Sequence, residues 1–137
     1  MTAETDVPVA GRRRFVVDTS VFVGLEQDRL ERFPVGDQIA TNVVTLGELT
    51  LGVLHAKDTA SRNARLRTLT AAQQFECLGI DADVAEVWAQ IVAQAKASGR
   101  RARVNDCWIA AIAKTNGATV LTQDRDFEML DVDVVTL

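Results

Sequence analysis

Short apolar runs alternate with longer amphipathic stretches along most of this chain. Phe15–Val17 and Ala118–Leu121 have the length and composition of buried strands, whereas Ala82–Ala97 repeats its apolar residues at the helical period of 3.6. The pattern predicts strands at 15–17, 39–41, 75–78, 118–121 and 132–135, helices at 21–27, 45–56, 60–72, 82–97 and 105–116, and a helical turn at 126–130. Short apolar strands that alternate with helices are typical of a parallel sheet covered on both faces. We therefore predict an α/β fold with a mostly parallel sheet.

Length and composition narrow the class of protein. A chain of 137 residues, 47% hydrophobic and 25% charged, is ordinary for one globular domain. No apolar run approaches the ~20 residues of a membrane span, and the first residues do not form a secretion signal. We expect a single domain over residues 1–137, with a flexible leader at 1–11 and no membrane association. The two cysteines, Cys77 and Cys107, are expected to be buried thiols of a cytoplasmic protein.

Charge is unevenly distributed along the chain. The net charge of −4 argues against a protein that holds nucleic acid by general electrostatics. The stretch 122–137 carries five acidic residues against the single Arg125. Arg100, Arg101 and Arg103 form a basic cluster in the predicted loop before the helix at 105–116. This cluster is either a solvated loop or a place where an anion binds.

Four acidic residues lie just after predicted strands or at the start of the helices that follow them. They are Asp18 after the first strand, Glu48 and Asp106 in the first turns of the helices at 45–56 and 105–116, and Asp124 after the strand at 118–121. Sites in parallel sheets lie outside the carboxyl ends of the strands, so these acids can converge at one edge. Each acid also has a structural interpretation on its own. Asp18 and Asp124 are suited to capping, Thr45 and Glu48 match a capping box, and Asp106 complements a helix dipole.

A group of carboxylates with no neighbouring His or Cys has the ligand chemistry of a hard divalent cation. Mg²⁺ and Mn²⁺ prefer oxygen ligands, and Mg²⁺ is often completed by substrate phosphates. Without a cation, four close carboxylates would repel one another. With one, the site could bind a phosphodiester and activate a water molecule.

Four segments of the chain resemble the acidic motifs of PIN-domain ribonucleases. They are Phe15–Val21, Thr45–Leu49, Asn105–Ala111 and Leu121–Phe127. Their order and spacing match essentially the whole chain from Phe15, and its size is similar to that of the VapC toxins of bacterial toxin–antitoxin pairs. The resemblance implies a three-layer α/β/α sandwich and Mg²⁺- or Mn²⁺-dependent cleavage of RNA by an activated water. It also implies a cognate VapB-like antitoxin and a homodimer.

The resemblance assigns roles to individual residues. It places Asp18, Glu48, Asp106 and Asp124 in the catalytic and metal-binding site. Asp18 and Asp106 are expected to be the principal metal ligands, with Glu48 and Asp124 orienting water or holding a second metal. Asp126 is the alternative fourth acid; Thr19, Ser20 and Thr122 are candidates for a supporting hydroxyl, and Arg100, Arg101 and Arg103 for RNA binding.

Three other functions stay open at this point. The first is a catalytically silent PIN-like scaffold that binds RNA or protein. The second is a DNA-directed nuclease of the same fold, because the acids do not read the sugar. The third is a receiver-like Mg²⁺-binding domain. Against it, Asp18 is single where receivers carry paired acids, and Lys114 lies within a predicted helix rather than at a strand end.

Overall fold

A single parallel sheet organises the part of the chain that the computed structural model describes, residues 13–27 and 38–137. The strands are β1 (Arg14–Val17), β2 (Gln38–Asn42), β3 (Glu76–Leu78), β4 (Thr119–Thr122) and β5 (Val134–Thr136), in the spatial order β3-β2-β1-β4-β5. All four strand pairs are parallel, which confirms the predicted mostly parallel sheet. The predicted leader at 1–11 lies outside the described residues.

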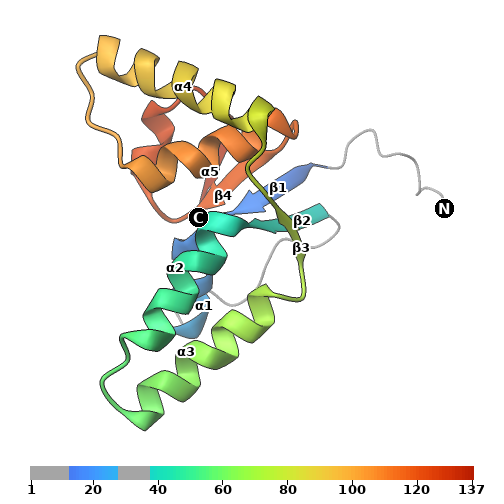
Figure 1. Ribbon diagram of the computed structural model, residues 1–137, viewed down its shortest axis with the longest axis vertical. Helices are drawn as coiled ribbons and strands as arrows, with labels where there is room; N and C mark the ends of the chain where they lie inside the picture. Colours follow the sequence, from blue (N-terminus) through green and yellow to red (C-terminus); the bar gives the residue numbers. More distant parts are fainter. Residues whose placement is uncertain (1–12, 28–37) are drawn as a thin grey trace, which may run out of the picture.

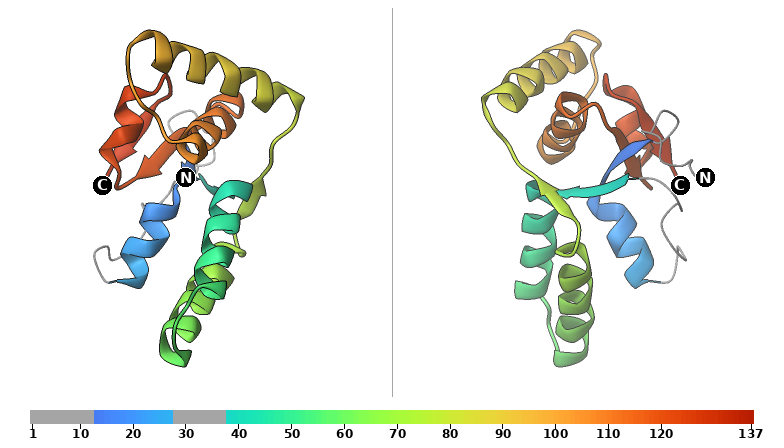
Figure 2. Two further views of the ribbon diagram at one scale, coloured as in Figure 1. Left: turned by 60° about the vertical axis from the view of Figure 1, so that its left-hand side comes forward. Right: turned by 90° about the vertical axis from the view of Figure 1, so that its right-hand side faces the viewer.

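Helices cover both faces of this sheet. They are α1 (Thr19–Glu26), α2 (Val43–Leu54), α3 (Thr59–Ala72), α4 (Ala82–Ala97) and α5 (Val104–Thr115), with a 3-10 turn η1 (Arg125–Met129). Helices α1, α2 and α3 lie on one face, α4 and α5 on the other, and α2 and α3 form a hairpin that projects from the sheet (Figures 1 and 2). Every element lies within two residues of its predicted bounds.

The alternation of side chains along the central strands explains the three layers. Phe15 and Val17 pack in the core beneath α1–α3, whereas Val16, between them, packs against α4 and α5. Val120 and Leu121 of β4 divide between the two cores in the same way. Successive strand side chains point to opposite faces, so a central strand that is apolar throughout needs cover on both. The predicted α/β/α sandwich is therefore confirmed.

The structure confirms the expected burial of only one of the two cysteines. Cys107 is buried, but Cys77 is exposed, so the prediction of two buried thiols is wrong for Cys77. Cys77 lies on β3, an edge strand with a neighbour on one side only, and the sequence pattern alone does not distinguish an edge strand from a central one.

No helix in the described residues is long and apolar enough to cross a membrane. The single-domain organisation of residues 1–137 stays a prediction.

The strand order locates the edge of the sheet where a site is expected. From β1 in the centre the chain proceeds to β2 on one side, and β4 later pairs with β1 on the other side. The order thus reverses between β1 and β4, and ligands of such sheets bind at that switch point, outside the carboxyl ends. The ends of these two strands are joined by a hydrogen bond of 2.9 Å from the Asp18 backbone N to the Leu121 carbonyl.

Candidate active site

Asp18 lies at the switch point, directly after β1, and is 5% exposed. Its Oδ2 accepts hydrogen bonds from Ser20 Oγ at 2.7 Å, Ser20 N at 3.3 Å and Thr122 Oγ1 at 2.8 Å. Burial raises the pKa of Asp18, and the hydrogen bonds from Ser20 and Thr122 act against this rise. Asp18 is also the N-cap of α1, which confirms its capping interpretation, and a capping carboxylate can still face the site.

Ser20 and Thr122 connect the two strand ends on which the site is built. Their hydroxyl oxygens lie 3.2 Å apart, and Ser20 Oγ also accepts from the backbone N of Gln123 at 2.9 Å. Thr122 Oγ1 accepts from the backbone N of Asp124 at 2.9 Å. Two of the three predicted hydroxyls therefore fix the position of Asp18 relative to the segment that carries Asp124.

Asp106 lies in the first turn of α5, as predicted, with its carboxylate at the same edge of the sheet. Its Oδ2 is buried, and no donor among the described residues reaches it. Burial, followed by the charges of Asp18 and Asp124, raises the pKa of Asp106 to about 7. The charge of Glu48 acts in the same direction, and Arg103 opposes it. The four acids are thus close enough to interact electrostatically around Asp106.

Glu48 lies near the site, but not through the local structure that the sequence pattern suggests. Helix α2 begins at Val43, so Glu48 lies in its second turn rather than the first. The capping box of Thr45 and Glu48 is also wrong, because Asn42 is the N-cap and its Oδ1 accepts from Thr45 N at 2.8 Å. Glu48 Oε1 instead accepts from Thr19 Oγ1 at 2.5 Å, and Oε2 accepts from Asn105 Nδ2 at 3.1 Å.

The two candidates for the fourth acid differ in their surroundings. Asp124 is the N-cap of η1, and its Oδ1 accepts from the backbone N of Asp126 at 2.9 Å. Its charge contributes to the raised pKa of Asp106. Asp126 is exposed and does not contribute to that rise. This geometry favours Asp124, the acid nearer to the strand end.

The donor set fits a divalent cation, although the carboxylates are not drawn together into a finished coordination sphere. Within residues 13–27 and 38–137, no group of three or more His, Cys, Asp or Glu side chains is close enough to hold a metal ion as it stands. Glu48 accepts from the neutral donors Thr19 and Asn105, and Asp124 lies beside Arg103, while repulsion between carboxylates disfavours their closer approach without a cation. The buried, unpartnered oxygen of Asp106 lacks the cationic partner that buried carboxylates normally have.

The predicted basic cluster lies in the connection from α4 to α5. Arg100 and Arg101 are exposed and line a pocket of about 280 Å³ with Lys96, next to the start of α5. Arg103 Nη1 lies 3.9 Å from Asp124 Oδ2, and its side chain is 73% exposed. The sequence singled out Arg103 for its charge, but its pairing with an acid of the site depends on the tertiary fold.

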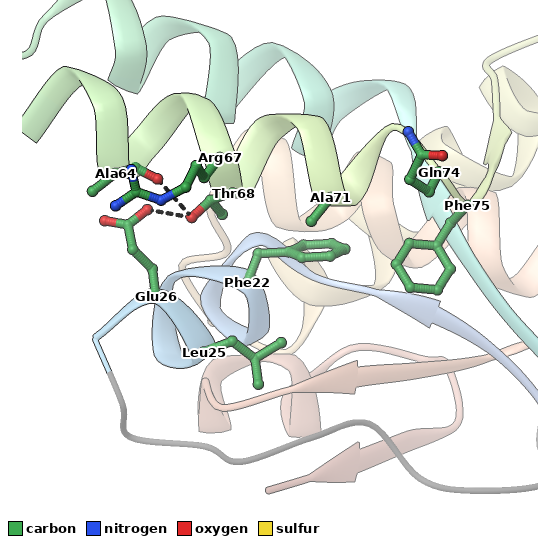
Figure 3. Close-up of a pocket in the computed structure, with 9 residues that line it drawn as sticks. All are labelled: Phe22, Leu25, Glu26, Ala64, Arg67, Thr68, Ala71, Gln74 and Phe75. Atoms are coloured by element: carbon green, nitrogen blue, oxygen red, sulfur yellow. Dashed lines mark hydrogen bonds between the residues drawn. The ribbon is translucent and has the colours of Figure 1, made fainter.

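Two pockets on the α1 side have different chemistry. The smaller one, about 200 Å³, is lined by Thr19, Glu48 and Arg65 among others and borders the acids. The larger one, about 480 Å³, lies between α1 and α3, and Figure 3 shows Phe22, Leu25 and Phe75 along it. None of the four acids lines this larger pocket, and its mainly apolar lining is unsuited to a phosphodiester.

Sequence reasoning gave no role in the site to Asn42, Thr45 or Asn105; Asn105 contacts Glu48, Thr45 contacts Thr19, and Asn42 contacts Thr45. Asn42 and Thr45 are completely buried. One signal could have found Asn42: the polar residues Thr41 and Asn42 end β2, just as Asp18 and Thr19 follow β1. Asn105 is adjacent to Asp106, but its sequence position does not reveal that it reaches α2.

Comparison with known proteins places this geometry in a family. The model of the PIN domain matches residues 15–133. The chain is 48% identical over 128 residues to ribonuclease VapC4 of Mycobacterium tuberculosis, covering 91% of this chain and 98% of the relative. It is 46% identical over 125 residues to ribonuclease VapC5 of the same organism, covering 90% of each.

A solved structure agrees with the sequence comparison. The crystal structure of VapBC-5, a member of the VapBC family of toxin–antitoxin systems from M. tuberculosis, superposes with a TM-score of 0.80 at 42% identity. The superposition covers 90% of this chain and 98% of that one. The predicted family and enzyme class are confirmed: this chain belongs to the VapC ribonucleases of the PIN-domain family.

Proposed function

We propose that this chain is the toxin of a toxin–antitoxin pair and hydrolyses RNA phosphodiester bonds at the four acids around Asp106. The observation that carries this proposal is the buried, unpartnered Oδ2 of Asp106, close enough to Asp18, Asp124 and Glu48 for their charges to raise its pKa. Such an arrangement is electrostatically costly unless a cation joins it. Divalent-metal dependence is general in this family, and the oxygen-only donor set supports Mg²⁺ or Mn²⁺ as the ion.

Each acid has a distinct task in this proposal. Asp18 and Asp106 hold the cation, because they are the two acids whose pKa values burial raises. A bound divalent cation lowers the pKa of water and stabilises the charge on a phosphodiester. Glu48 and Asp124 would orient the attacking water or support a second ion. Each is held by a hydrogen bond that one of its carboxylate oxygens accepts. Ser20 and Thr122 keep Asp18 in place.

The basic cluster supplies positive charge next to the acidic site, and this charge attracts the phosphates of RNA. Arg100, Arg101 and Arg103 lie within six residues of Asp106, on the segment that leads into α5. We assign the RNA backbone to this segment, where the exposed Arg103 could exchange Asp124 for a phosphate. Charged pairs as exposed as this one contribute little to stability, so their exchange costs little.

Substitution of the basic cluster tests this assignment. Changing both Arg100 and Arg101 to Gln is expected to raise KM for RNA several-fold with kcat nearly unchanged. The slope of log affinity against log salt should fall by about 0.7 for each phosphate that the two arginines neutralise in wild type. Arg62→Gln, an exposed position on α3, is the matched control and should leave both quantities unchanged. An unchanged KM and salt slope in the double variant would remove this segment from the RNA-binding surface.

The proposed partner is a VapB-like antitoxin, and the proposed assembly is a homodimer in the cytoplasm. Support for the partner comes from the structural relative VapBC-5 of M. tuberculosis, a member of the VapBC family of toxin–antitoxin systems. The apolar pocket between α1 and α3 and the exposed Leu51 and Leu54 of α2 offer surface on which protein partners bind. An RNA substrate and a protein inhibitor are both consistent with a cytoplasmic site of action.

Cleavage assays test the proposed function directly. Purified, antitoxin-free protein is incubated with tRNA, ribosomal RNA fragments, an unstructured RNA oligomer and single-stranded DNA, each with Mg²⁺, Mn²⁺ or EDTA. We expect cleavage of RNA with either metal and none with EDTA. Cleavage of DNA alone would instead establish a DNA-directed nuclease. Folded protein that cuts no substrate under any condition would support the silent scaffold.

A further inference from the structure

A buried series of hydrogen bonds connects the end of β2 to the site. Asn42 and Thr45 have no exposed surface. Asn42 Nδ2 donates to the Val17 carbonyl at 3.1 Å and to Thr45 Oγ1 at 3.0 Å, and its Oδ1 accepts from Thr45 N at 2.8 Å. These bonds use both amide protons and the amide oxygen, so the orientation of the Asn42 side chain is fixed.

The series continues through the hydroxyl groups of Thr45 and Thr19. Thr19 Oγ1 lies 3.0 Å from Thr45 Oγ1 and 2.5 Å from Glu48 Oε1. A hydroxyl has one proton and a carboxylate only accepts, so the Thr19 proton points to Glu48. Thr45 Oγ1, which accepts from Asn42, lies within hydrogen-bond distance of the Thr19 hydroxyl and holds its oxygen beside Glu48. The series therefore connects Asn42, Thr45, Thr19 and Glu48.

Glu48 is therefore held at both oxygens. Oε1 accepts from Thr19 Oγ1, and Oε2 accepts from Asn105 Nδ2 at 3.1 Å, next to Asp106. Hydrogen bonds to a charged acceptor are stronger than neutral ones, and bonds in series polarise one another. A carboxylate that interacts unfavourably with the charge of Asp106 needs such fixed donors to stay at the site.

We propose that Thr45, anchored by Asn42, is a positioning residue for RNA cleavage: it orients the Thr19 hydroxyl and, through it, the Glu48 carboxylate. This inference rests on the proposed function, because it concerns the same site. Partners that orient the acids of a metal site typically contribute 10–100-fold to activity or metal affinity. We expect an effect of that order from Thr45, which itself does not touch substrate.

The chain offers a matched control for this position. Thr41 is also completely buried, lies one residue before Asn42, and its Oγ1 has no hydrogen-bond partner among the described residues. Thr41→Val and Thr45→Val both remove one hydroxyl at nearly constant volume. Only Thr45→Val interrupts the hydrogen-bond series, so the pair separates loss of the series from a general effect of changing a buried threonine.

The test compares Thr45→Val, Thr45→Ser, Thr19→Val, Thr41→Val and wild type. Thr45→Val is expected to lower kcat by about 10–100-fold with KM within about threefold of wild type. Thr45→Ser keeps the hydroxyl and should restore kcat to within about threefold. Thr41→Val should match wild type. Because the members act through one series, Thr19→Val combined with Thr45→Val should be little worse than either alone.

Metal binding gives a readout that does not depend on cleavage. Titration of Mn²⁺, followed by the electron paramagnetic resonance of the free ion, should show weaker binding in Thr45→Val than in wild type or Thr41→Val. If wild type binds Mn²⁺ but cuts no RNA, the proposed function fails and this comparison still tests the positioning role.

The inference is overturned by folded Thr45→Val with wild-type kcat and Mn²⁺ affinity, or by Thr45→Ser that is as impaired as Thr45→Val. Should Thr45→Val not fold, the half-buried Thr19 carries the test. In that case, Thr19→Val with wild-type kcat and Mn²⁺ affinity would equally overturn it.

Discussion

Asp106→Asn is expected to reduce RNA cleavage by well over 100-fold while the protein stays folded. The substitution keeps the shape of the side chain but removes its charge. Asp106 is the acid whose pKa the charges of the other three acids raise. An amide is a weaker ligand for a hard cation than a carboxylate, so metal binding should be lost together with cleavage. The loss should exceed the 10–100-fold typical of residues that only support a ligand.

A matched control for this variant lies at the equivalent position of another helix. Asp83 is in the first turn of α4, as Asp106 is in the first turn of α5, but it is exposed and contributes nothing to the raised pKa of Asp106. Asp83→Asn should cleave RNA at the wild-type rate. Cleavage at a similar rate by Asp106→Asn and Asp83→Asn would show that the reaction does not use this carboxylate.

Without metal, the melting temperature of the protein is expected to fall as the pH rises through 7. The pKa of Asp106 is about 7 in the folded state, against 3.8 for the unfolded reference, and the pKa of Asp18 is also raised. Between pH 3.8 and about 7, the folded state binds more protons at Asp106 than the unfolded state does, so lower pH stabilises the folded state. This stabilisation is complete below pH 3.8 and is lost as the pH rises through the folded value.

The stability prediction is measured by thermal unfolding in EDTA between pH 5 and 8. We expect a decrease of several degrees over that range, because 1 kcal/mol changes the melting temperature of a domain this size by roughly 3–5 °C. Asp106→Asn should remove most of the decrease and melt higher than wild type at pH 8. Adding Mn²⁺ to wild type should have a similar stabilising effect at pH 8. A metal-free protein that becomes more stable from pH 6 to 8 would contradict the electrostatic account of the site. Asp58, whose pKa is lowered, titrates below this window and does not disturb the measurement.

The elements and the convergence of the acids could be predicted because local signals determine them. The 3.6-residue period of Ala82–Ala97 identified a helix with the bounds observed for α4. The chemistry of strand ends brought Asp18 and Asp124 to one edge, since parallel strands share the direction of their carboxyl ends. Asp106 lies at the start of α5, the helix that leads into β4, and such helices begin at this same edge. These inferences need only the order of residues and the topology of the sheet.

The remaining features depend on distances between elements, which the order of residues does not contain. Thr45 and Glu48 match the sequence pattern of a capping box. In the structure Asn42 is the N-cap instead, so the helix starts earlier than this pattern predicts. The sequence shows Arg103 as part of a basic run. The 3.9 Å between its Nη1 and Asp124 Oδ2 depends on how the α4–α5 connection packs. The exposure of Cys77 follows from the position of β3 at the edge of the sheet.

The central claim, that the acids around Asp106 form one cation site at which RNA is cut, is tested most directly by following Mn²⁺ binding and RNA cleavage in the same samples. Wild-type protein and a variant with both Asp18→Asn and Asp106→Asn are titrated with Mn²⁺, and bound metal and cleavage rate are recorded at each step. We predict that cleavage by wild type rises in parallel with bound Mn²⁺, and that the double variant shows neither. Full Mn²⁺ binding by the double variant, or cleavage by wild type with no metal bound, would contradict this account.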